Sequence, residues 1–515
     1  MLMHRMLVDA AERDPDRIAF RWVDRDKHLT YGEAVVAMER MAGALASLGV
    51  GPGDRVSVFA HNGLDYLLAM LGAWRLGAIS ALVNVKFADD LPSYAADHTP
   101  KVIIYTHDMA QPAAAAKRSV ASVTHLVCMD GPQDGAESLP DLLAANLPAP
   151  PDPGDADAIA HLSYTSGTTG RPKGACLKHE PTVRASRCIG ERLRIRRDDV
   201  SFGPTALSSS YQLVANLLPS LAVGATINIM GRWTGASGWG AVEAAGASFF
   251  VGNPIVLEEL LVESRQRQRL PGRLRFLLSG GGPVPPTLKR AWRDEFAVPL
   301  VESYGQSELG GFFALGFPEL EGADDRLLRI GPSLPDRVTR IVGSDGRPVP
   351  LGTTGEIALT EGGFMVGYWG MPEKTAEATA GGILRSGDLG VMDESGYITM
   401  RGRRSELVRV AGRDWFPRDV EEALGRQPGI GLCALVGVAD AALGARPIAF
   451  AVAAPGARPE PEALKAALRL EVPYDIAPLE IRLVDALPMT PTGKIAKAEL
   501  AAAASRSASN DGGGH

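Results

Sequence analysis

The chain has 515 residues, of which 45% are hydrophobic and 22% are charged. This balance is typical of a globular protein and excludes fibrous and fully disordered classes, and the length corresponds to about two or three structural units. The formal net charge is −7, from 53 Lys and Arg against 60 Asp and Glu. Because nucleic-acid binding usually depends on a positive field, we expect no nucleic-acid partner.

The cysteines and the apolar stretches give no sign of secretion or membrane insertion. The first residues reach charged side chains before any apolar run develops, which is unlike a signal peptide. The most apolar long stretch, 66–83, contains Arg75 and two glycines, so it favours a helix followed by a strand over a membrane span. We therefore expect a cytoplasmic protein. No Cys-x-x-Cys spacing predicts a disulfide framework or a zinc site among Cys128, Cys176, Cys188 and Cys433.

The first part of the chain alternates between helical and strand patterns. Thr30 and Glu33 match a capping box, and apolar residues then recur about once per helical turn as far as Gly49, which predicts a helix that ends there. Such strands and helices in alternation indicate parallel sheets with helices packed on their faces. A second helix is predicted at 64–76, and short strands at 54–60, 79–83, 101–105 and 124–128. Residues 129–158, rich in Pro, Asp, Gly and Ala, are predicted to form a surface loop.

The pattern changes in the last third of the chain. Residues 333–402 contain short β-patterned runs separated by glycines, which predicts a smaller β-rich subdomain. From residue 405 a mixed pattern returns, and the Ala-, Ser- and Gly-rich end is predicted to be disordered. The sequence thus predicts an α/β fold with a large N-terminal domain over 1–404, a small α+β domain over 405–500 and a disordered tail over 501–515.

The most specific motif is the run Tyr-Thr-Ser-Gly-Thr-Thr-Gly-Arg-Pro-Lys-Gly over 164–174. Its glycines let the backbone approach a ligand, its hydroxyls add donors, and successive backbone N–H groups of such a loop form an anion-binding concavity. The run is not a Walker A loop, because Pro172 precedes Lys173 and Gly174 follows it. A cradle for polyphosphate is favoured over a flexible surface loop. Its candidate binding residues are Thr165, Ser166, Gly167, Thr168, Thr169, Gly170 and Lys173.

This loop resembles the phosphate-loop signature of the adenylate-forming superfamily, which comprises acyl- and aryl-CoA synthetases, adenylation domains of peptide synthetases, and luciferases. The resemblance covers nearly the whole chain, because the further motifs described below occur in the expected order. It implies an adenylation core followed by a mobile lid domain. It also implies ATP, Mg²⁺ and coenzyme A as cofactors, and a small carboxylic acid as the substrate.

The run Glu-Ser-Tyr-Gly-Gln-Ser-Glu over 302–308 combines an aromatic ring, a glycine and two carboxylates. Mg²⁺ prefers oxygen ligands and commonly takes one or two carboxylates together with substrate phosphate. By resemblance, Glu308 binds the metal and Tyr304 lies against the adenine, while Ser307 replaces a more usual Thr and keeps its hydroxyl. A solvated acidic loop is the alternative. Glu302, Ser303, Gly305 and Ser307 join Tyr304 in the predicted ATP site.

Two further motifs resemble nucleotide-binding segments of the superfamily. Ser-Gly-Gly-Gly-Pro follows a predicted strand at 274–278, and there Gly281 and Gly282 are expected at the adenine and Gly280 at the acyl group. Strand ends also use such glycines for purely geometric reasons. Asp388 resembles the ribose-binding aspartate and Arg403 a second ribose or phosphate contact. The alternatives are a turn-forming Asp and a solvated arginine cluster.

The end of the chain carries the predicted moving parts. Ser405 falls at the position of the superfamily's hinge, where Asp or Lys is more usual, and a hinge requires only backbone freedom. Gly412 and Arg409 are expected to contact coenzyme A after the lid rotates. Lys494 matches the superfamily's catalytic lysine and is predicted to be catalytic together with Lys173. A surface lysine is the alternative for Lys494.

The acid substrate is less well defined by the sequence. Many relatives in the superfamily carry an aromatic residue and a His where this chain has Ser208 and Ser209, so acyl specificity does not carry over. Tyr211, Gly280 and Gly310 are the predicted acyl contacts, within apolar segments that show no obvious cation. A monocarboxylate is therefore favoured, either aromatic or aliphatic of short to medium length.

These observations predict an AMP-forming carboxylic acid–CoA ligase. It would adenylate a carboxylate with ATP, release pyrophosphate and then form a thioester with coenzyme A. The alternatives are a stand-alone adenylation enzyme that serves a carrier protein, a luciferase-type oxidase and a non-catalytic nucleotide-binding homologue. The chain ends without a carrier domain and keeps its candidate charged residues, which favours a free thiol acceptor and catalysis. Both a monomer and a homodimer are compatible with the sequence.

Overall fold

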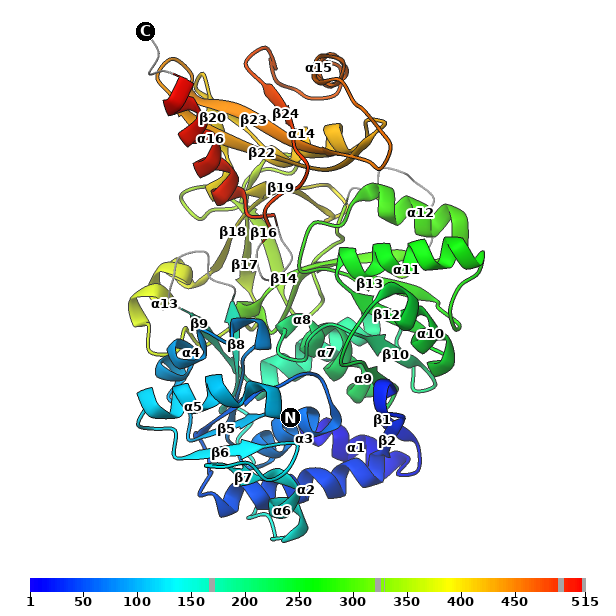
Figure 1. Cartoon of the computed structure of the whole chain (residues 1–515), viewed down its shortest axis with the longest axis vertical. Helices are drawn as coiled ribbons and strands as arrows, with labels where there is room; N and C mark the ends of the chain where they lie inside the picture. The colour runs from blue at the N-terminus through cyan, green and yellow to red at the C-terminus, as the bar shows by residue number, and fades with distance from the viewer. Residues whose placement is uncertain (166–171, 320–325, 328, 490–494, 512–515) are drawn as a thin grey trace. The chain divides into compact units, whose positions relative to one another are not determined.

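The computed structural model describes residues 1–165, 172–319, 326–327, 329–489 and 495–511 (Figure 1). The chain divides into two compact units. The first consists of Met1–Thr339 and Leu359–Leu384, and the second of Arg340–Ala358 and Arg385–His515.

A seven-stranded sheet in the first unit has the strand order β7-β6-β5-β3-β4-β8-β9. All neighbouring strands run parallel except the last pair, β8 and β9, which is antiparallel. The predicted parallel sheet is therefore confirmed, and it ends in a hairpin. Its strands are β3 (Arg55–Phe59), β4 (Ile79–Leu82), β5 (Val102–Tyr105), β6 (His125–Cys128), β7 (Glu137–Ser138), β8 (Ile159–Thr165) and β9 (Lys173–Lys178).

The two longest helices of this region begin where the sequence predicts, and they pack against each other. The capping box of α2 (Tyr31–Ser47) is present, because the Glu33 backbone N–H donates to the Thr30 hydroxyl at 3.2 Å and the Thr30 N–H donates to the Glu33 carboxylate at 2.8 Å. Helix α3 (Leu64–Arg75) packs against α2, where a Cβ at Gly72 would lie 2.7 Å from Met41. Glycine at that position therefore allows the two helices to approach closely.

An eight-stranded sheet, also in the first unit, has the order β15-β14-β13-β12-β10-β11-β1-β2. Its six central strands are parallel, and the strand at each edge is antiparallel to its neighbour. The strands are β1 (Ile18–Trp22), β2 (Lys27–Thr30), β10 (Val200–Gly203), β11 (Thr226–Ile229), β12 (Phe249–Gly252), β13 (Phe276–Ser279), β14 (Leu300–Gln306) and β15 (Gly311–Leu315).

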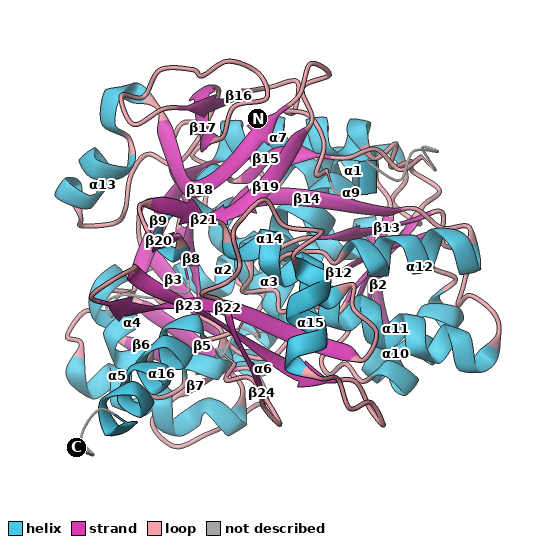
Figure 2. Ribbon diagram, turned by 90° about the horizontal axis from the view of Figure 1, so that it is seen from above, coloured by secondary structure: helices cyan, strands magenta, loops and turns pink. Residues whose placement is uncertain are grey.

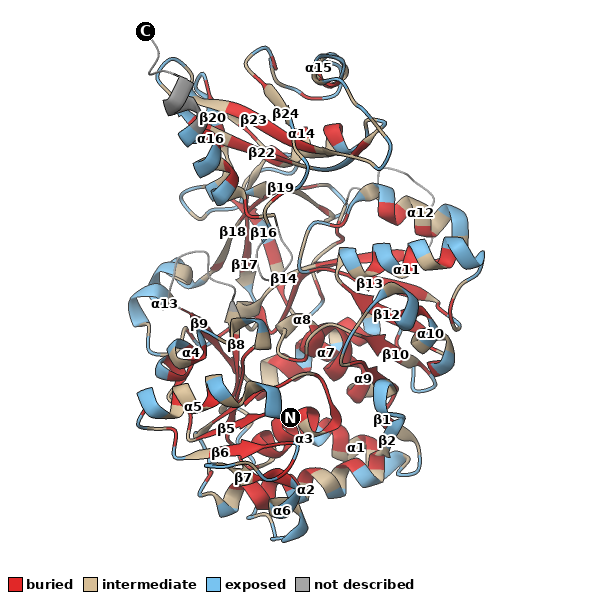
Figure 3. Ribbon diagram, in the orientation of Figure 1, coloured by how far each residue is buried: buried red, intermediate tan, exposed pale blue. Residues whose placement is uncertain are grey.

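Both faces of this sheet are covered by helices (Figure 2). Alternate residues of a strand face opposite sides. Phe250 accordingly packs with Trp239 and Trp292, from the layer of α10 (Gly235–Ala245), α11 (Pro254–Arg267) and α12 (Pro286–Phe296). Phe249 instead packs in the core shared with α7 (His179–Arg192) and α9 (Leu218–Val223). The central strands are therefore buried on both faces (Figure 3).

Further helices complete the first unit, and those within 91–119 pack against β5 and β6 of the seven-stranded sheet. These further helices are α1 (Arg5–Arg13), α4 (Leu91–His98), α5 (Ala110–Ser119), α6 (Leu139–Ala144), α8 (Ser210–Gln212) and α13 (Pro372–Ala378). Strand β7 and helix α6 fall within 129–158, where the sequence predicted only a loop, because Ser138 caps α6 by accepting from the Asp141 N–H and Leu139 is buried.

Two smaller sheets are formed by later parts of the chain. A four-stranded sheet has the order β16-β17-β18-β19, and a five-stranded sheet has the order β21-β20-β23-β22 with β24 paired to β23. The α/β fold class with a smaller β-rich part is thus confirmed. The elements are β16 (Val338–Val342), β17 (Gly355–Glu361), β18 (Leu384–Met392), β19 (Ile398–Arg403), β20 (Val408–Val410), β21 (Arg413–Trp415), β22 (Ile430–Asp440), β23 (Gly444–Ala453), β24 (Glu480–Leu483), α14 (Pro417–Gly425), α15 (Pro461–Leu468) and α16 (Lys497–Asp511).

Helix α16 occupies much of the segment that the sequence predicted to be a disordered tail from residue 501. Leu500 and Ala504 of this helix are buried in an apolar cluster with Val436 and Phe450 of the five-stranded sheet. Alanine has the highest helix propensity, so a composition that indicates disorder also suits a helix once one of its faces is covered.

The four cysteines are free thiols. Among the helices of the described ranges, none combines the length and the hydrophobicity needed to cross a bilayer.

Candidate active site

The predicted phosphate loop connects the two strands of the β8–β9 hairpin. The last residue pair of this hairpin is Thr165 and Lys173, so the strands bring the two ends of the loop together. Between them, Ser166, Gly167, Thr168, Thr169 and Gly170 lie outside the described residues. The hairpin therefore fixes where the two ends of this segment lie.

A tyrosine that the sequence analysis did not single out connects two predicted site residues. The Tyr368 hydroxyl donates a hydrogen bond to the Glu308 carboxylate at 2.7 Å. The Lys173 ammonium lies 5.6 Å from the centroid of the Tyr368 ring, within the range of a cation–π interaction. The phosphate-loop lysine and the predicted metal-binding glutamate thus meet at one aromatic side chain.

The strand that leads into the phosphate loop is anchored to α4 by side-chain hydrogen bonds. The Tyr164 hydroxyl donates to the Asp97 carboxylate at 2.9 Å and lies 2.9 Å from the ring Nδ1 of His98. Opposite Tyr164 on β9 is Gly174, where a Cβ would approach the Tyr164 ring to 3.2 Å. Glycine therefore leaves room for the anchoring ring between the two strands.

Acidification is expected to destabilise the first unit through its buried histidines. Burial lowers the pKa of His98 to about 3 and that of His161, on β8, to about 4. In the unfolded chain the pKa of a histidine is about 6.5. Because the folded pKa is the lower one, the stability contribution is fully present above about pH 6.5 and is lost as the pH falls toward the folded pKa, by about 1.4 kcal/mol per histidine and pH unit.

Urea unfolding measured between pH 7.5 and pH 5 tests this prediction. The ring Nδ1 of His161 lies 2.8 Å from the Ser80 hydroxyl, so His161→Asn keeps a polar neutral group there and should give a shallower pH dependence. A free energy of unfolding that does not change over this range would contradict the prediction.

The carboxylate of Glu302, which was predicted in the ATP site, forms a buried ion pair. Its partner is Lys289 on α12, and the two side chains are only 7% and 4% exposed. The next two residues of β14 also make contacts inside the protein. The Ser303 hydroxyl donates to the Ser279 carbonyl at 2.9 Å, and the Tyr304 ring stacks on Phe313. The Glu302 side chain therefore fastens β14 to α12.

Replacing Lys289 with alanine is expected to lower the free energy of unfolding by about 3–5 kcal/mol, because a buried charge is left without its partner. Chemical denaturation measures this effect. The double variant Lys289→Met with Glu302→Gln, which removes both charges, should recover most of the loss. Equal destabilisation in the single and double variants would show that the ion pair itself is not the cause.

Two of the three predicted acyl contacts lie together. Tyr211 faces Phe312, with ring centroids 6.1 Å apart, and a Cβ at Gly280 would approach the Tyr211 ring to 2.8 Å. Gly310 instead lies against α7, since a Cβ there would be 3.0 Å from the Thr182 hydroxyl. The structure therefore brings Tyr211 and Gly280 together but not Gly310.

Ser209, one of the two serines that set this chain apart in the sequence analysis, caps the short helix α8. Its hydroxyl accepts a hydrogen bond from the Tyr211 N–H at 3.3 Å. A π-helical segment, Leu213–Leu217, follows directly. Such segments are rare and occur often at functional sites. The next predicted glycines, Gly281 and Gly282, have no atom within 4 Å of an added Cβ.

The predicted ribose-binding residues meet in the second unit. Asp388 on β18 and Arg403 on β19 are cross-strand partners, and the arginine Nε lies 3.3 Å from the aspartate Oδ1. The part of β18 before Asp388 is held by Glu356, which accepts from the Gly387 N–H at 2.9 Å and pairs with Arg385 at 2.8 Å. Sequence reasoning missed Glu356, because its role depends on the fold of the sheet.

The predicted hinge and coenzyme A residues are also in the second unit. Ser405 lies in a short 3₁₀ helix, and the next residue, Glu406, pairs with Lys497 at 2.8 Å. Gly412 has a φ of +79° in the tight turn between β20 and β21. Arg409, on β20, pairs with Asp414 at 2.8 Å.

The predicted catalytic residue Lys494 lies outside the described residues. Within the described ranges, no group of three or more His, Cys, Asp or Glu side chains is arranged to hold a metal ion.

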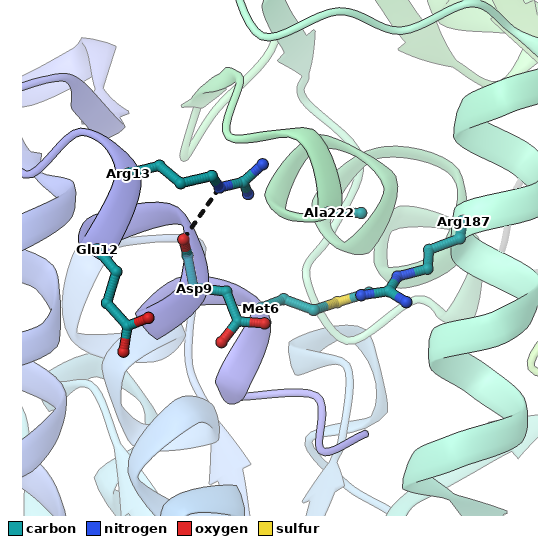
Figure 4. A pocket seen from close by; sticks show the side chains of 6 residues that line it. All are labelled: Met6, Asp9, Glu12, Arg13, Arg187 and Ala222. Carbon is teal, nitrogen blue, oxygen red and sulfur yellow. Dashed lines mark hydrogen bonds between the residues drawn. The ribbon is translucent and has the colours of Figure 1, made fainter.

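A surface hollow in the first unit is lined mainly by charged side chains (Figure 4). Asp9, Glu12 and Arg13 of α1 line it with Arg187 of α7 and with Met6 and Ala222, and the Arg13 Nε donates to the Asp9 carbonyl at 3.0 Å. None of the predicted site residues is part of it.

Comparisons with known proteins match this architecture along almost the entire chain. A family profile described as AMP-binding enzyme matches residues 7–369, and one described as AMP-binding enzyme C-terminal domain matches residues 419–494.

Named relatives are similar over nearly their whole length. A feruloyl-CoA synthase of Amycolatopsis sp. is 31% identical over 475 residues, which cover 92% of this chain and 93% of that protein. A sulfoacetate–CoA ligase of Cupriavidus necator is 30% identical over 488 residues, or 94% of each chain. The crystal structure of ATP-bound MatB from Rhodopseudomonas palustris superposes with a TM-score of 0.89 at 26% identity, over 98% of this chain and 99% of that one.

Proposed function

Because the chain belongs to the family of AMP-binding enzymes and is an AMP-forming carboxylic acid–CoA ligase, we propose that the β8–β9 hairpin and Glu308 hold the ATP phosphates and that the acid is aromatic. The observation that carries the nucleotide assignment is the meeting of Lys173 and Glu308 at Tyr368. A cation and a carboxylate at one place suit a nucleotide phosphate and its metal ion.

Mg²⁺ fits the oxygen donors of this site. Glu308 supplies one carboxylate, and no cage of protein ligands occurs in the described residues, which suits an ion that is completed by substrate phosphates and water. When bound, the ion supplies neutralisation of the charge that develops on pyrophosphate. Lys173 adds a positive charge on the same phosphates. We assign the neighbouring Tyr304 to the adenine ring and the hydroxyl of Ser307 to the phosphates.

Asp388 and Arg403 are proposed to bind the ribose. Asp388 is 6% exposed, and its carboxylate can accept hydrogen bonds from two adjacent hydroxyl groups. Arg403 lies across the strand pair, with its Nε 3.3 Å from the aspartate Oδ1, and so places a positive charge beside the proposed ribose site. Glu356 holds the backbone of β18 next to Asp388, so its removal would disturb ribose binding indirectly.

The rings near Gly280 favour an aromatic acid. Tyr211 lies against the buried Phe312 at an interplanar angle of 49°. Its own ring is partly exposed, and aromatic rings pack well against one another in offset or edge-to-face arrangements. Gly280 allows the Tyr211 ring to lie directly against the backbone, because a Cβ there would be only 2.8 Å from that ring. One relative is named for feruloyl-CoA, the thioester of an aromatic acid, whereas another is named for sulfoacetate.

The second half-reaction is assigned to the C-terminal part of the chain. We propose that residues 405–500 move as a lid about Ser405 and that Gly412 and Arg409 then contact coenzyme A. Lys494 would act in the first half-reaction and leave the site when the lid turns. Glycine at 412 leaves room for a narrow thiol chain to approach the backbone closely. Its positive φ also disfavours a residue with a side chain at this position.

A pyrophosphate-exchange screen over aromatic, short aliphatic and sulfonated acids tests the proposal, with thioester formation measured after adding coenzyme A. We expect the strongest exchange with an aromatic acid and thioester only when coenzyme A is present. Exchange restricted to aliphatic or sulfonated acids would contradict the aromatic assignment. A lack of exchange with every acid would contradict the nucleotide assignment.

A further inference from the structure

We propose that Tyr368 is a positioning residue for the metal–phosphate centre, and that its hydroxyl orients Glu308 toward Mg²⁺ while its ring holds Lys173 toward the phosphates. This inference rests on the proposed roles of Glu308 and Lys173. It assigns a new role to a side chain that lies between the two, in a segment far from both in the sequence.

The hydroxyl of Tyr368 acts on one oxygen of the glutamate. It donates to the Glu308 Oε1 at 2.7 Å, a length typical of a strong hydrogen bond to a charged acceptor. A tyrosine has an ordinary pKa of about 10, so the phenol is a proton donor at neutral pH. A donor on Oε1 fixes the plane of the carboxylate and thereby the direction in which it can bind a metal ion.

The ring of Tyr368 acts on the lysine without neutralising it. The Lys173 Nζ lies 5.6 Å from the ring centroid, and attraction to the ring face orients an ammonium group without cancelling its charge. A carboxylate in the same place would instead compensate that charge before the phosphates arrive. An aromatic partner therefore leaves the full positive charge available to the substrate.

The backbone around Tyr368 is fastened to the elements that carry both of its partners. The Met365 N–H donates to the Glu308 carbonyl at 2.6 Å, and the Trp369 N–H donates to the Gly174 carbonyl, next to Lys173, at 2.8 Å. The Tyr368 N–H donates to the Thr375 hydroxyl of α13 at 2.9 Å. These bonds fix the tyrosine relative to both the metal-binding and the phosphate-binding residue.

Equilibrium binding of α,β-methylene-ATP to the full chain tests this role, because the analogue cannot be adenylated and binding is read without turnover. Titration calorimetry in excess MgCl₂ and in EDTA gives a ratio of the two affinities for each variant. For Tyr368→Phe we expect this ratio to fall about tenfold, as is typical when a residue that orients a metal ligand is lost. The affinity in EDTA should stay unchanged, since the ring remains.

Two further variants separate the roles of the hydroxyl and the ring. Tyr368→Leu removes both and should also weaken binding in EDTA, by about fivefold, through the loss of the lysine contact. Tyr474→Phe is the matched control, because the Tyr474 hydroxyl donates to the Asp419 carboxylate at 2.6 Å outside the predicted site. This control should bind as the parent chain does in both buffers.

The inference is overturned if Tyr368→Phe keeps the parent ratio. It is also overturned if this variant loses affinity equally in both buffers, which would indicate a general structural role. If the parent chain itself does not bind the analogue, the proposed role of Lys173 in phosphate binding is wrong. If the parent chain binds it equally well with and without Mg²⁺, the proposed role of Glu308 in metal binding is wrong.

Discussion

Replacement of Lys494 by alanine is expected to lower the rate of adenylate formation by about 10²–10³, the usual effect of removing one well-placed charge from a transition state. An anionic carboxylate must attack an anionic α-phosphate, so repulsion between like charges opposes the reaction. A lysine on a long flexible stem can bridge the two groups. Pyrophosphate exchange measures this half-reaction, and thioester formation from a supplied acyl-adenylate measures the second one, which should be spared.

Lys465→Ala is a suitable control for this experiment. Lys465 is also in the C-terminal part of the chain, and its ammonium donates to the Ala477 carbonyl at 2.8 Å in an exposed position. Both half-reactions should be unchanged in this variant. If Lys494→Ala adenylated at the parent rate, or if it lost both half-reactions equally, the assignment of Lys494 would be wrong.

Replacement of Glu308 by glutamine is expected to remove most of the magnesium-dependent turnover, by about 10² at moderate Mg²⁺ concentration. The amide keeps the shape of the side chain and can still accept from Tyr368, but it lacks the negative charge that attracts the ion. Pyrophosphate exchange as a function of the Mg²⁺ concentration measures the effect. Partial recovery at high Mg²⁺ would indicate weaker metal binding.

Glu243→Gln provides the control for this substitution. Glu243 lies on α10, pairs with Arg269 at 2.7 Å and is not part of the predicted site. Its loss should leave the magnesium dependence unchanged. A magnesium dependence of Glu308→Gln identical to that of the parent chain would show that this glutamate does not bind the ion.

The elements that were predicted correctly are those whose cause is local. Thr30 and Glu33 satisfy each other's backbone donors within one turn, so the start of α2 is visible in four residues. The alternation of strand and helix patterns likewise indicates parallel strands, because each helix buries its apolar face against the sheet that the strands form. Asp388 and Arg403 were named from separate motifs, and the sequence did not predict that they pair across β18 and β19.

The contacts that were missed depend on tertiary structure. Tyr368 meets Lys173 and Glu308 because its segment lies beside β9, which no local pattern indicates. Glu302 looked like a ligand-binding carboxylate, yet Lys289 from a neighbouring helix neutralises it in the interior. Helix α16 was missed because an Ala-rich composition indicates disorder unless the surface that buries one face of the helix is known.

The most direct measurement is the identity of the nucleotide products when the purified chain is incubated with ATP, Mg²⁺, an accepted aromatic acid and coenzyme A. If the hairpin, Lys173 and Glu308 present the α-phosphate to a carboxylate, AMP and pyrophosphate should appear in equal amounts with one thioester each. Release of ADP and inorganic phosphate, or consumption of ATP without any thioester, would contradict this account.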